Sequence, residues 1–264
     1  MELGIEGRVA LIGGSSKGLG KATAIALARE GVKVVICARG AEELTRTASE
    51  IASATSEDRV LFVQADLSKH EDVNKVVRFA VERFGRLDIL VNNAGGPPQG
   101  IPSALTDDQW LSALDLNFFS TVRLCRAALP YMRRQQWGRI INFLSFATKE
   151  PVNGLALSTA ARLAVIGFAK SLADEVAIEG VTVNSILTGY ILTGRSLGLF
   201  QSRAEASGKT VDEIVKQNSA AIPAGRLGRP EEMADLALFL ASDRATYITG
   251  ASIPIDGGIL RAAL

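Results

Sequence analysis

A glycine-rich segment near the start of the chain has the residue types for binding phosphate, with Gly14, Gly18 and Gly20 spaced as Gly-x-x-x-Gly-x-Gly. Glycine lets a backbone turn sharply and approach a phosphate closely, because it carries no Cβ. A helix that begins directly after such a turn offers unpaired N–H groups and the positive end of its dipole. The segment follows an apolar run at residues 9–12 and opens a stretch with helical periodicity. It therefore predicts a site for the diphosphate of a dinucleotide.

Seven short apolar runs must position this segment and the other candidate site residues. They are rich in Val and Ile, which is typical of strands buried on both faces of a parallel sheet. The runs cover residues 9–12, 32–38, 60–63, 89–91, 140–144, 181–187 and 253–255, and helical periodicity covers 19–30, 42–54, 73–84, 110–134, 163–178 and 231–240. This alternation predicts an α/β fold with a single doubly wound domain of the Rossmann type. Its parallel sheet would have seven strands, with helices on both faces.

No repeat, low-complexity tract or linker divides the chain, so we expect one domain over residues 1–264. A long insert at residues 193–229 separates the sixth strand from the last helix, and none of its residues has a chemistry that names a ligand. Such an insert at the ligand edge is typical of a lid or of a solvated excursion, and we favour the lid. The pairs Ser68/Glu71 and Thr210/Glu213 have the spacing of capping boxes at helix starts.

The composition argues against several functions. The chain has 29 Lys+Arg and 28 Asp+Glu, for a net charge of +1, whereas nucleic-acid binding requires a basic face. One His and two Cys, Cys37 and Cys125, provide neither a metal cluster nor a disulfide framework. We expect buried, inert thiols and a reducing, cytoplasmic location. No apolar run approaches the ~20 residues that span a bilayer, and the start lacks a signal-peptide shape, so no membrane partner is expected.

Further motifs follow the glycine segment across nearly the whole chain: Asp66-Leu67, Asn92-Asn93-Ala94-Gly95, Asn117, the segment 188–193 and the segment 250–258. Their order resembles the short-chain dehydrogenase/reductase family, with the ketoacyl-carrier-protein reductases as the nearest group. The resemblance implies a dinucleotide cofactor, a small carbonyl or alcohol substrate and a homo-oligomer, either a tetramer or a dimer. The expected cofactor-binding residues are Gly14, Ser16, Lys17, Gly18, Leu19, Gly20, Arg39, Asp66, Leu67, Asn93, Ala94, Gly95, Arg162, Gly189, Ile191 and Thr193.

The end of the second predicted strand bears on which dinucleotide binds. Ala38 stands where a protein that prefers NAD(H) would place a carboxylate on the ribose 2′-OH. Arg39 can bind a 2′-phosphate with its planar guanidinium, with help from Lys17 in the glycine segment. The sequence therefore favours NADP(H) over NAD(H), although both cations could also be ordinary solvated surface residues.

The catalytic residues of the family are a Ser, a Tyr thirteen residues later and a Lys four residues after the Tyr. Ser145 matches the Ser, and the family's Tyr and Lys positions hold Ser158 and Arg162. The upstream Ser145 and the downstream Gly167-Phe168 fix this register without a gap. By this resemblance the candidate catalytic residues are Asn117, Ser145, Ser158 and Arg162, in an atypical site that lacks the Tyr acid.

The replacement of Tyr by Ser has a chemical consequence. A phenol has a pKa near ~10 that a neighbouring cation can lower, whereas an aliphatic hydroxyl is a far weaker acid. Loss of a positioned general acid typically slows a reaction about 10²- to 10⁴-fold. Water is one alternative source of the proton, and Lys149 and Tyr190 are the nearest candidate side chains. Arg162 could still bind the ribose or polarise a substrate oxygen.

Three functions remain open from the sequence. The first is an NADP(H)-dependent oxidoreductase that resembles 3-oxoacyl reductases and acts on a carbonyl or alcohol. The second is a dinucleotide-binding sensor or scaffold without catalysis, and the third is an enzyme that uses the pocket without redox change. The intact cofactor motifs favour the first.

Overall fold

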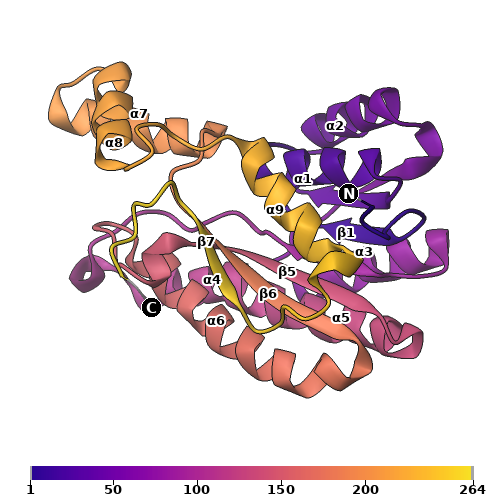
Figure 1. The fold of residues 1–264 in the computed structure, drawn as a ribbon. Helices are drawn as coiled ribbons and strands as arrows, with labels where there is room; N and C mark the ends of the chain where they lie inside the picture. The colour runs from indigo at the N-terminus through magenta and orange to yellow at the C-terminus, as the bar shows by residue number, and fades with distance from the viewer. Residues whose placement is uncertain (1, 263–264) are drawn as a thin grey trace.

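The computed structural model describes residues 2–262, so residues 1, 263 and 264 of the predicted domain lie outside the described part. A parallel sheet of seven strands crosses the centre of the molecule in the order β3-β2-β1-β4-β5-β6-β7 (Figure 1). The strands are β1 Val9–Ile12, β2 Lys33–Ala38, β3 Val60–Gln64, β4 Ile89–Asn92, β5 Gly138–Ser145, β6 Val181–Thr188 and β7 Ser252–Ile255. The direction of winding reverses between β1 and β4, where doubly wound folds bind ligands. The predicted fold class is confirmed.

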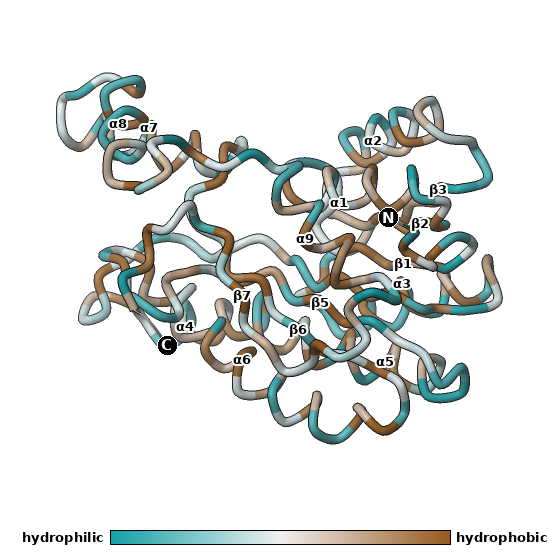
Figure 2. Tube along the Cα trace, in the orientation of Figure 1, coloured by the Kyte–Doolittle hydropathy of each residue, from teal (hydrophilic) through white to brown (hydrophobic). Residues whose placement is uncertain are grey.

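Helices cover both faces of the sheet. Apolar side chains of α1, α2 and α9 form the core on one face with β1 and β2, and those of α3, α5 and α6 form the core on the other. Figure 2 shows hydrophobic segments running through the sheet between more polar surface turns. The helices are α1 Gly18–Arg29, α2 Ala41–Ala54, α3 His70–Phe84, α4 Asp107–Leu114, α5 Ser120–Gln135, α6 Ala156–Val176, α7 Gly194–Ser207, α8 Val211–Ala221 and α9 Pro230–Ala241.

Two sequence predictions about helices need correction. The single helix expected over residues 110–134 is α4 and α5 separated by a π-helical stretch, Asp115–Phe119. The capping box expected at Ser68 is absent, because the Ser68 hydroxyl donates a hydrogen bond to Asp66 Oδ1 at 2.8 Å and Lys69 precedes α3. The capping box at Thr210 is confirmed at the start of α8.

The insert at residues 193–229 contains α7 and α8, a pair of helices that stands away from the sheet in Figure 1. The pair has a small apolar core of its own, which includes Phe200, Ala204 and Ile214. The role of this insert as a lid stays a prediction.

The cysteines and the longest apolar segment can be compared with the predictions from composition. Cys37 and Cys125 are free, buried thiols, and burial raises the pKa of each to about 12, so both are inert as expected. The segment Ala156–Glu179 is long and apolar enough to cross a membrane by length and composition. Its main part, α6, packs on β6 and supplies core residues, which accounts for this apolar character.

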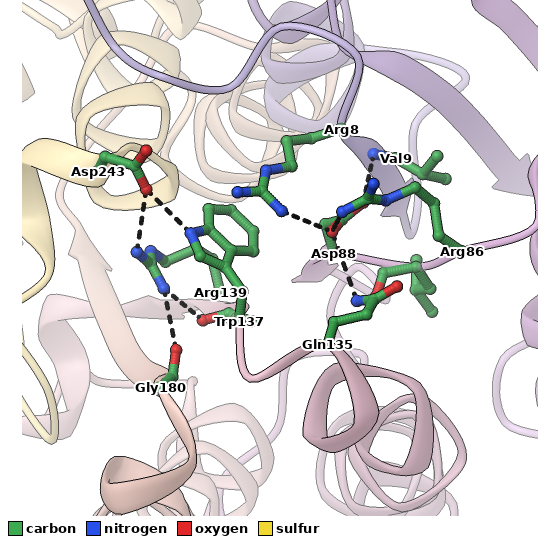
Figure 3. A network of polar contacts seen from close by, with 11 residues as sticks. Arg8, Val9, Arg86, Asp88, Gln135, Trp137, Arg139, Gly180 and Asp243 are labelled. Carbon is green, nitrogen blue, oxygen red and sulfur yellow. Dashed lines mark hydrogen bonds and ion pairs between the residues drawn. The ribbon is translucent and has the colours of Figure 1, made fainter.

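The amino ends of β1 and β4 are joined by a buried carboxylate (Figure 3). Asp88 is fully buried and accepts a hydrogen bond from the backbone N–H of Val9 at 2.9 Å. Arg86 donates two hydrogen bonds to the same carboxylate, at 2.7 and 2.6 Å, and Arg8 donates a third at 3.3 Å. These guanidiniums compensate the burial of the charge, which would otherwise be costly.

A second cluster lies beside it at the amino end of β5. The guanidiniums of Arg8 and Arg139 both lie over the Trp137 ring, at 3.9 and 4.1 Å from its centroid. Trp137 Nε1 donates to Asp243 Oδ1 at 2.9 Å, and Arg139 Nη2 lies 3.5 Å from the same oxygen. Every arginine at this edge of the sheet that Figure 3 labels therefore contacts a carboxylate, an aromatic ring or both.

Candidate functional site

The glycine segment forms a tight turn between β1 and α1. Gly14 and Gly18 adopt φ angles of +55° and +59°, in the left-handed region that side chains rarely occupy. A Cβ at Gly14 would lie 2.5 Å from the Asn93 carbonyl oxygen. The Asn93 side chain donates to the carbonyls of Gly13 and Gly14, at 3.1 and 3.3 Å. The turn therefore holds its shape through Asn93 at the end of β4.

Two hydroxyl side chains that the sequence reasoning missed fix the same turn. Ser15 Oγ donates to the Ile12 carbonyl at 2.7 Å and accepts from the Cys37 N–H at 3.0 Å, so it joins the turn to β2. Thr47 Oγ1 donates to the Ser16 carbonyl at 2.8 Å from α2. The contacts with Cys37 and from Thr47 join residues far apart in the chain, so nothing in the local sequence indicates them.

A cavity of about 620 Å³ opens beside this turn, at the carboxyl ends of β1, β2, β3 and β4. Its volume falls within the range of about 300–1,000 Å³ that is usual for ligand and cofactor pockets. It is lined by Gly14, Ser16, Lys17, Gly18, Leu19, Ala38, Arg39, Gly40, Glu43, Ala65, Asp66, Leu67, Asn93, Ala94, Gly95, Gly96, Leu116, Thr193, Gly194 and Arg195. Most of the cofactor-binding residues expected from the sequence are therefore brought to one cavity.

At one end of the cavity, Arg39 and Lys17 lie near Ala38, where an acid would disfavour a 2′-phosphate. Glu43, which the sequence reasoning did not include, also lines this end. Its carboxylate lies 3.6 Å from Lys17 Nζ. Lys17 is therefore partly neutralised by an exposed ion pair, and Arg39 is the stronger candidate for binding an added phosphate.

Gly95 also lines the cavity, and two candidate side chains meet at its carbonyl. Asn117 Nδ2 donates to this oxygen at 3.0 Å, and Arg162 Nη2 donates to it at 2.8 Å. Arg162 Nη1 also donates to Ser158 Oγ, one turn earlier on α6. Asn117 belongs to the π-helical stretch between α4 and α5, a feature that is frequent at functional sites. Ser158 and Arg162, one turn apart on α6, are therefore in direct contact.

Two polar atoms of this group have no protein partner in residues 2–262. Asn117 Oδ1 and Arg162 Nε are both buried and without a hydrogen bond. A buried polar atom without a partner is costly, so such atoms point to a bound ligand or water. Asn117 Oδ1 and Arg162 Nε are therefore free to accept and to donate, respectively, toward a molecule bound beside Gly95.

Other predicted residues have hydrogen-bond partners or surroundings outside this group. Ser145 ends β5 beside Thr188, and its hydroxyl accepts from the Ala147 N–H at 3.2 Å. Gly20 is buried within α1, and Gly189 donates to the Ile255 carbonyl at 3.0 Å. Neither glycine lines the large cavity. Ile191 lines a smaller neighbouring cavity of about 170 Å³.

The two side chains considered as alternative acids lie in different environments. Lys149 is exposed on the turn that follows β5. The ring of Tyr190 packs against those of Phe146 and Phe200, with centroids 5.4 and 6.2 Å away. Tyr190 is thus part of an apolar wall, whereas Lys149 can exchange protons with solvent.

Arg195 is a further polar residue at this end, and the sequence reasoning missed it. It lies in the first turn of α7, and it donates to the carbonyls of Gly96 and Pro97 at 3.0 and 3.1 Å. Burial lowers the pKa of Arg195. Burial and, to a lesser extent, the charge of Arg195 lower the pKa of Arg162 to about 10. Both side chains stay protonated at neutral pH, and their charges lie close enough to interact.

Comparison with known proteins agrees with this geometry. The family model described as enoyl-(acyl carrier protein) reductase matches residues 14–260. The chain is 36% identical over 257 residues to the 3-oxoacyl-[acyl-carrier-protein] reductase FabG of Vibrio cholerae, covering 97% of this chain and 99% of the relative.

Solved structures of reductases share the fold. L-sorbose reductase from Gluconobacter frateurii, solved with NADPH and L-sorbose, superposes with a TM-score of 0.95 at 34% identity, over 99% of this chain and 100% of that one. A variant of actinorhodin polyketide ketoreductase, solved with NADPH, gives a TM-score of 0.91 at 31% identity, over 96% and 97%. The neighbours thus bind the dinucleotide that the sequence favoured. The chain belongs to the short-chain dehydrogenase/reductase family.

Proposed function

We propose that this chain is an NADPH-dependent ketoreductase that resembles the 3-oxoacyl reductases. The observation that carries the proposal is one cavity lined by the glycine turn, Arg39 and Gly95, together with the hydrogen bonds that Asn117 and Arg162 donate to the Gly95 carbonyl. The relatives add support, since a similar chain is a 3-oxoacyl reductase and similar structures hold NADPH.

The residues present fit a dinucleotide phosphate. Gly14 and Gly18, which adopt positive φ angles, let the turn approach a diphosphate closely, and Arg39 offers a planar fork to a 2′-phosphate. Asp66 and Leu67 would contact the adenine, and Ile191 and Thr193 the nicotinamide amide, as the family resemblance implies. When bound, NADPH supplies the hydride that reduces a carbonyl carbon.

The chain's own residues then hold and polarise the substrate. Asn117 fixes the Gly95 carbonyl, and with it the guanidinium of Arg162. From this position Arg162 binds the cofactor ribose and stabilises negative charge on the substrate oxygen, while Ser145 orients the carbonyl. Ser158 cannot act as the acid, so water or the exposed Lys149 delivers the proton. The insert at residues 193–229 acts as a lid that limits access of solvent.

Binding titrations and steady-state assays test this function. We expect the folded protein to bind NADPH more tightly than NADH and to oxidise NADPH in the presence of ketones or 3-oxoacyl thioesters. Product analysis should find the corresponding alcohol. NADPH binding without turnover on any member of this panel would contradict the proposal.

A second candidate function, a dinucleotide sensor without catalysis, is favoured by one observation. The hydroxyl at the family's Tyr position belongs to Ser158, which is buried and accepts a hydrogen bond from Arg162. A sensor would bind NADPH with a change in assembly or partner binding but without oxidation. The same titrations and assays separate the two functions.

We also propose that the protein is a cytoplasmic homo-oligomer. Three large apolar side chains, Leu111, Phe119 and Leu163, are exposed on α4, the π-helical stretch and α6. Elements α4, α6 and the π-helical stretch pack together, so these side chains belong to neighbouring surfaces. Light scattering of the purified protein should give the mass of a dimer or tetramer rather than that of the 28.0 kDa chain.

A further inference from the structure

Two guanidiniums converge on the short segment that follows β4. Arg162 reaches the Gly95 carbonyl from α6, and Arg195 reaches the carbonyls of Gly96 and Pro97 from α7. The two arginines therefore approach one stretch of three residues from separate elements. This stretch lies beside Asn117 and Ser158, at the end of the pocket where the substrate would bind.

Neither arginine is electrostatically compensated by the protein. Within residues 2–262, neither guanidinium forms an ion pair with a carboxylate, and their partners are backbone carbonyls and one hydroxyl. Arg195 also lies in the first turn of α7, where the helix dipole disfavours a cation. The charge of the half-buried Arg162, that of the exposed Arg195 and a helix N-terminus thus meet without a negative partner.

Both guanidiniums retain donors for a ligand. A guanidinium has five N–H groups. Arg195 uses one on Nη1 and one on Nη2 for Gly96 and Pro97, and Arg162 Nε is buried without a partner. Guanidinium donors match the geometry of a carboxylate, which can accept two parallel hydrogen bonds.

We propose that Arg162 and Arg195 bind a carboxylate of the substrate, so that the preferred ketones are oxo acids with the acid group near the carbonyl. This inference rests on the proposed ketoreductase function and names the substrate class of that site. It adds Arg195, a residue of the insert, to the groups that determine specificity.

The diphosphate of the cofactor is the other oxyanion that could bind here, and the contacts favour the substrate. The glycine turn that suits a diphosphate neighbours Thr193, since a Cβ added at Gly18 would lie 3.6 Å from Thr193 Cγ2. Arg195 lines the same cavity as the glycine turn, but its hydrogen bonds go to Gly96 and Pro97, next to the Gly95 carbonyl that accepts from Arg162. The two arginines are thus placed with the catalytic group.

A matched pair of ketones tests the inference, namely 3-oxobutanoate and its ethyl ester with NADPH. We expect the wild type to reduce the acid with a kcat/KM about 10- to 100-fold above that of the ester, as for hydrogen bonds to a charged group. Arg195→Gln should bring the ratio of the kcat/KM values for acid and ester close to one, and Arg195→Lys should retain part of the preference. Arg203→Gln removes a charge from the same helix, where Arg203 contacts Asn218, and should keep the preference.

A binding measurement without turnover separates this inference from the proposed function. Butanoate, which has no ketone, is titrated calorimetrically into the protein with NADP⁺, and butanamide serves as the neutral control. We expect Arg195→Gln to weaken the binding of butanoate at least tenfold, and to weaken it more than the binding of NADPH. If neither ketone is reduced but butanoate binding still depends on Arg195, the carboxylate site stands and the ketoreductase function fails.

Two results would overturn the inference. One is equal reduction of acid and ester together with butanoate binding that Arg195→Gln leaves unchanged, which refutes the site and leaves the ketoreductase function standing. The other is a loss of NADPH affinity in Arg195→Gln with butanoate unaffected, which would assign the arginine to the diphosphate of the cofactor.

Discussion

The two edges of the parallel sheet use arginine in opposite ways. At the amino edge, Arg8 and Arg86 converge on the buried carboxylate of Asp88. At the carboxyl edge, Arg162 and Arg195 contact backbone carbonyls and a hydroxyl, and no carboxylate of the described chain pairs with them. Both edges bring two positive charges together, but only the amino edge neutralises them within the described part of the protein.

This difference separates arginines that stabilise the fold from arginines that are available to a ligand. A buried ion pair is costly to disrupt, because removal of one partner leaves an uncompensated charge. An arginine without an acidic partner retains its charge for a molecule that enters the pocket. The pairing of a charged side chain is thus a better guide to its role here than its residue type.

The largest effect is expected on kcat, when Ser158 and Arg162 are replaced by the Tyr and Lys that are usual in the family. The double variant Ser158→Tyr, Arg162→Lys supplies a phenol as a positioned acid, which typically accelerates a reaction about 10²- to 10⁴-fold. We expect kcat for reduction of ethyl 3-oxobutanoate to rise by that factor, measured by NADPH absorbance. Ser171→Tyr, at an exposed position of α6, is the control and should give no gain. An unchanged kcat in a folded, NADPH-binding double variant would refute this prediction.

Removing the Asp88 charge at the amino edge should lower the stability of the fold and leave the pocket intact. Asp88→Asn keeps the shape of the side chain but removes the charge that Arg8 and Arg86 share, at a cost of about 3 kcal/mol in the free energy of unfolding. Urea denaturation measures this loss, and the NADPH affinity should stay unchanged. Glu175→Gln, which disrupts an exposed pair with Arg133, should cost less than about 1 kcal/mol. A comparable loss in the free energy of unfolding in both variants would show that the buried Asp88 carboxylate stabilises the fold no more than an exposed one.

The smallest expected effect is on cofactor preference, and it concerns the end of the cavity where Arg39 and Lys17 lie. Glu43→Gln frees Lys17 from an exposed ion pair, and such pairs contribute about 0.2–1 kcal/mol. We expect the preference for NADPH over NADH to rise by a factor of about 1.5–5, measured as a ratio of dissociation constants. Glu50→Gln on the same helix is the matched control, since Glu50 pairs with Lys21 instead. An unchanged ratio in Glu43→Gln would indicate that Lys17 does not contact the 2′-phosphate.

Much of the fold could be predicted because strands buried on both faces are continuous apolar runs. The run at residues 9–12 coincides with β1, and the other strands differ from prediction by one or two residues at their ends. The cavity residues were found because glycines and motif residues after β1 and β4 lie at the carboxyl edge in this topology.

The features that could not be predicted from the sequence have a common physical cause, because most of them depend on contacts that the local pattern does not show. Arg195 bonds to carbonyls 98 and 99 residues earlier in the chain, so its sequence neighbours give no sign of its role. Ser68 has the spacing of a helix cap but bonds to Asp66 instead. The helical pattern over residues 110–134 did not reveal the π-helical stretch, because its apolar residues keep the same approximate period.

A single-turnover experiment tests the central claim most directly. The protein in excess over NADPH is mixed with ethyl 3-oxobutanoate, and oxidation of bound NADPH and formation of the hydroxy ester are followed in the wild type and in Arg162→Gln. We predict stoichiometric conversion in the wild type and a rate about 10²- to 10³-fold lower in the variant, as for loss of one oxyanion donor. Bound NADPH that stays reduced in the wild type, or an Arg162→Gln variant that is equally fast, would contradict a ketoreductase site built on unpaired guanidiniums.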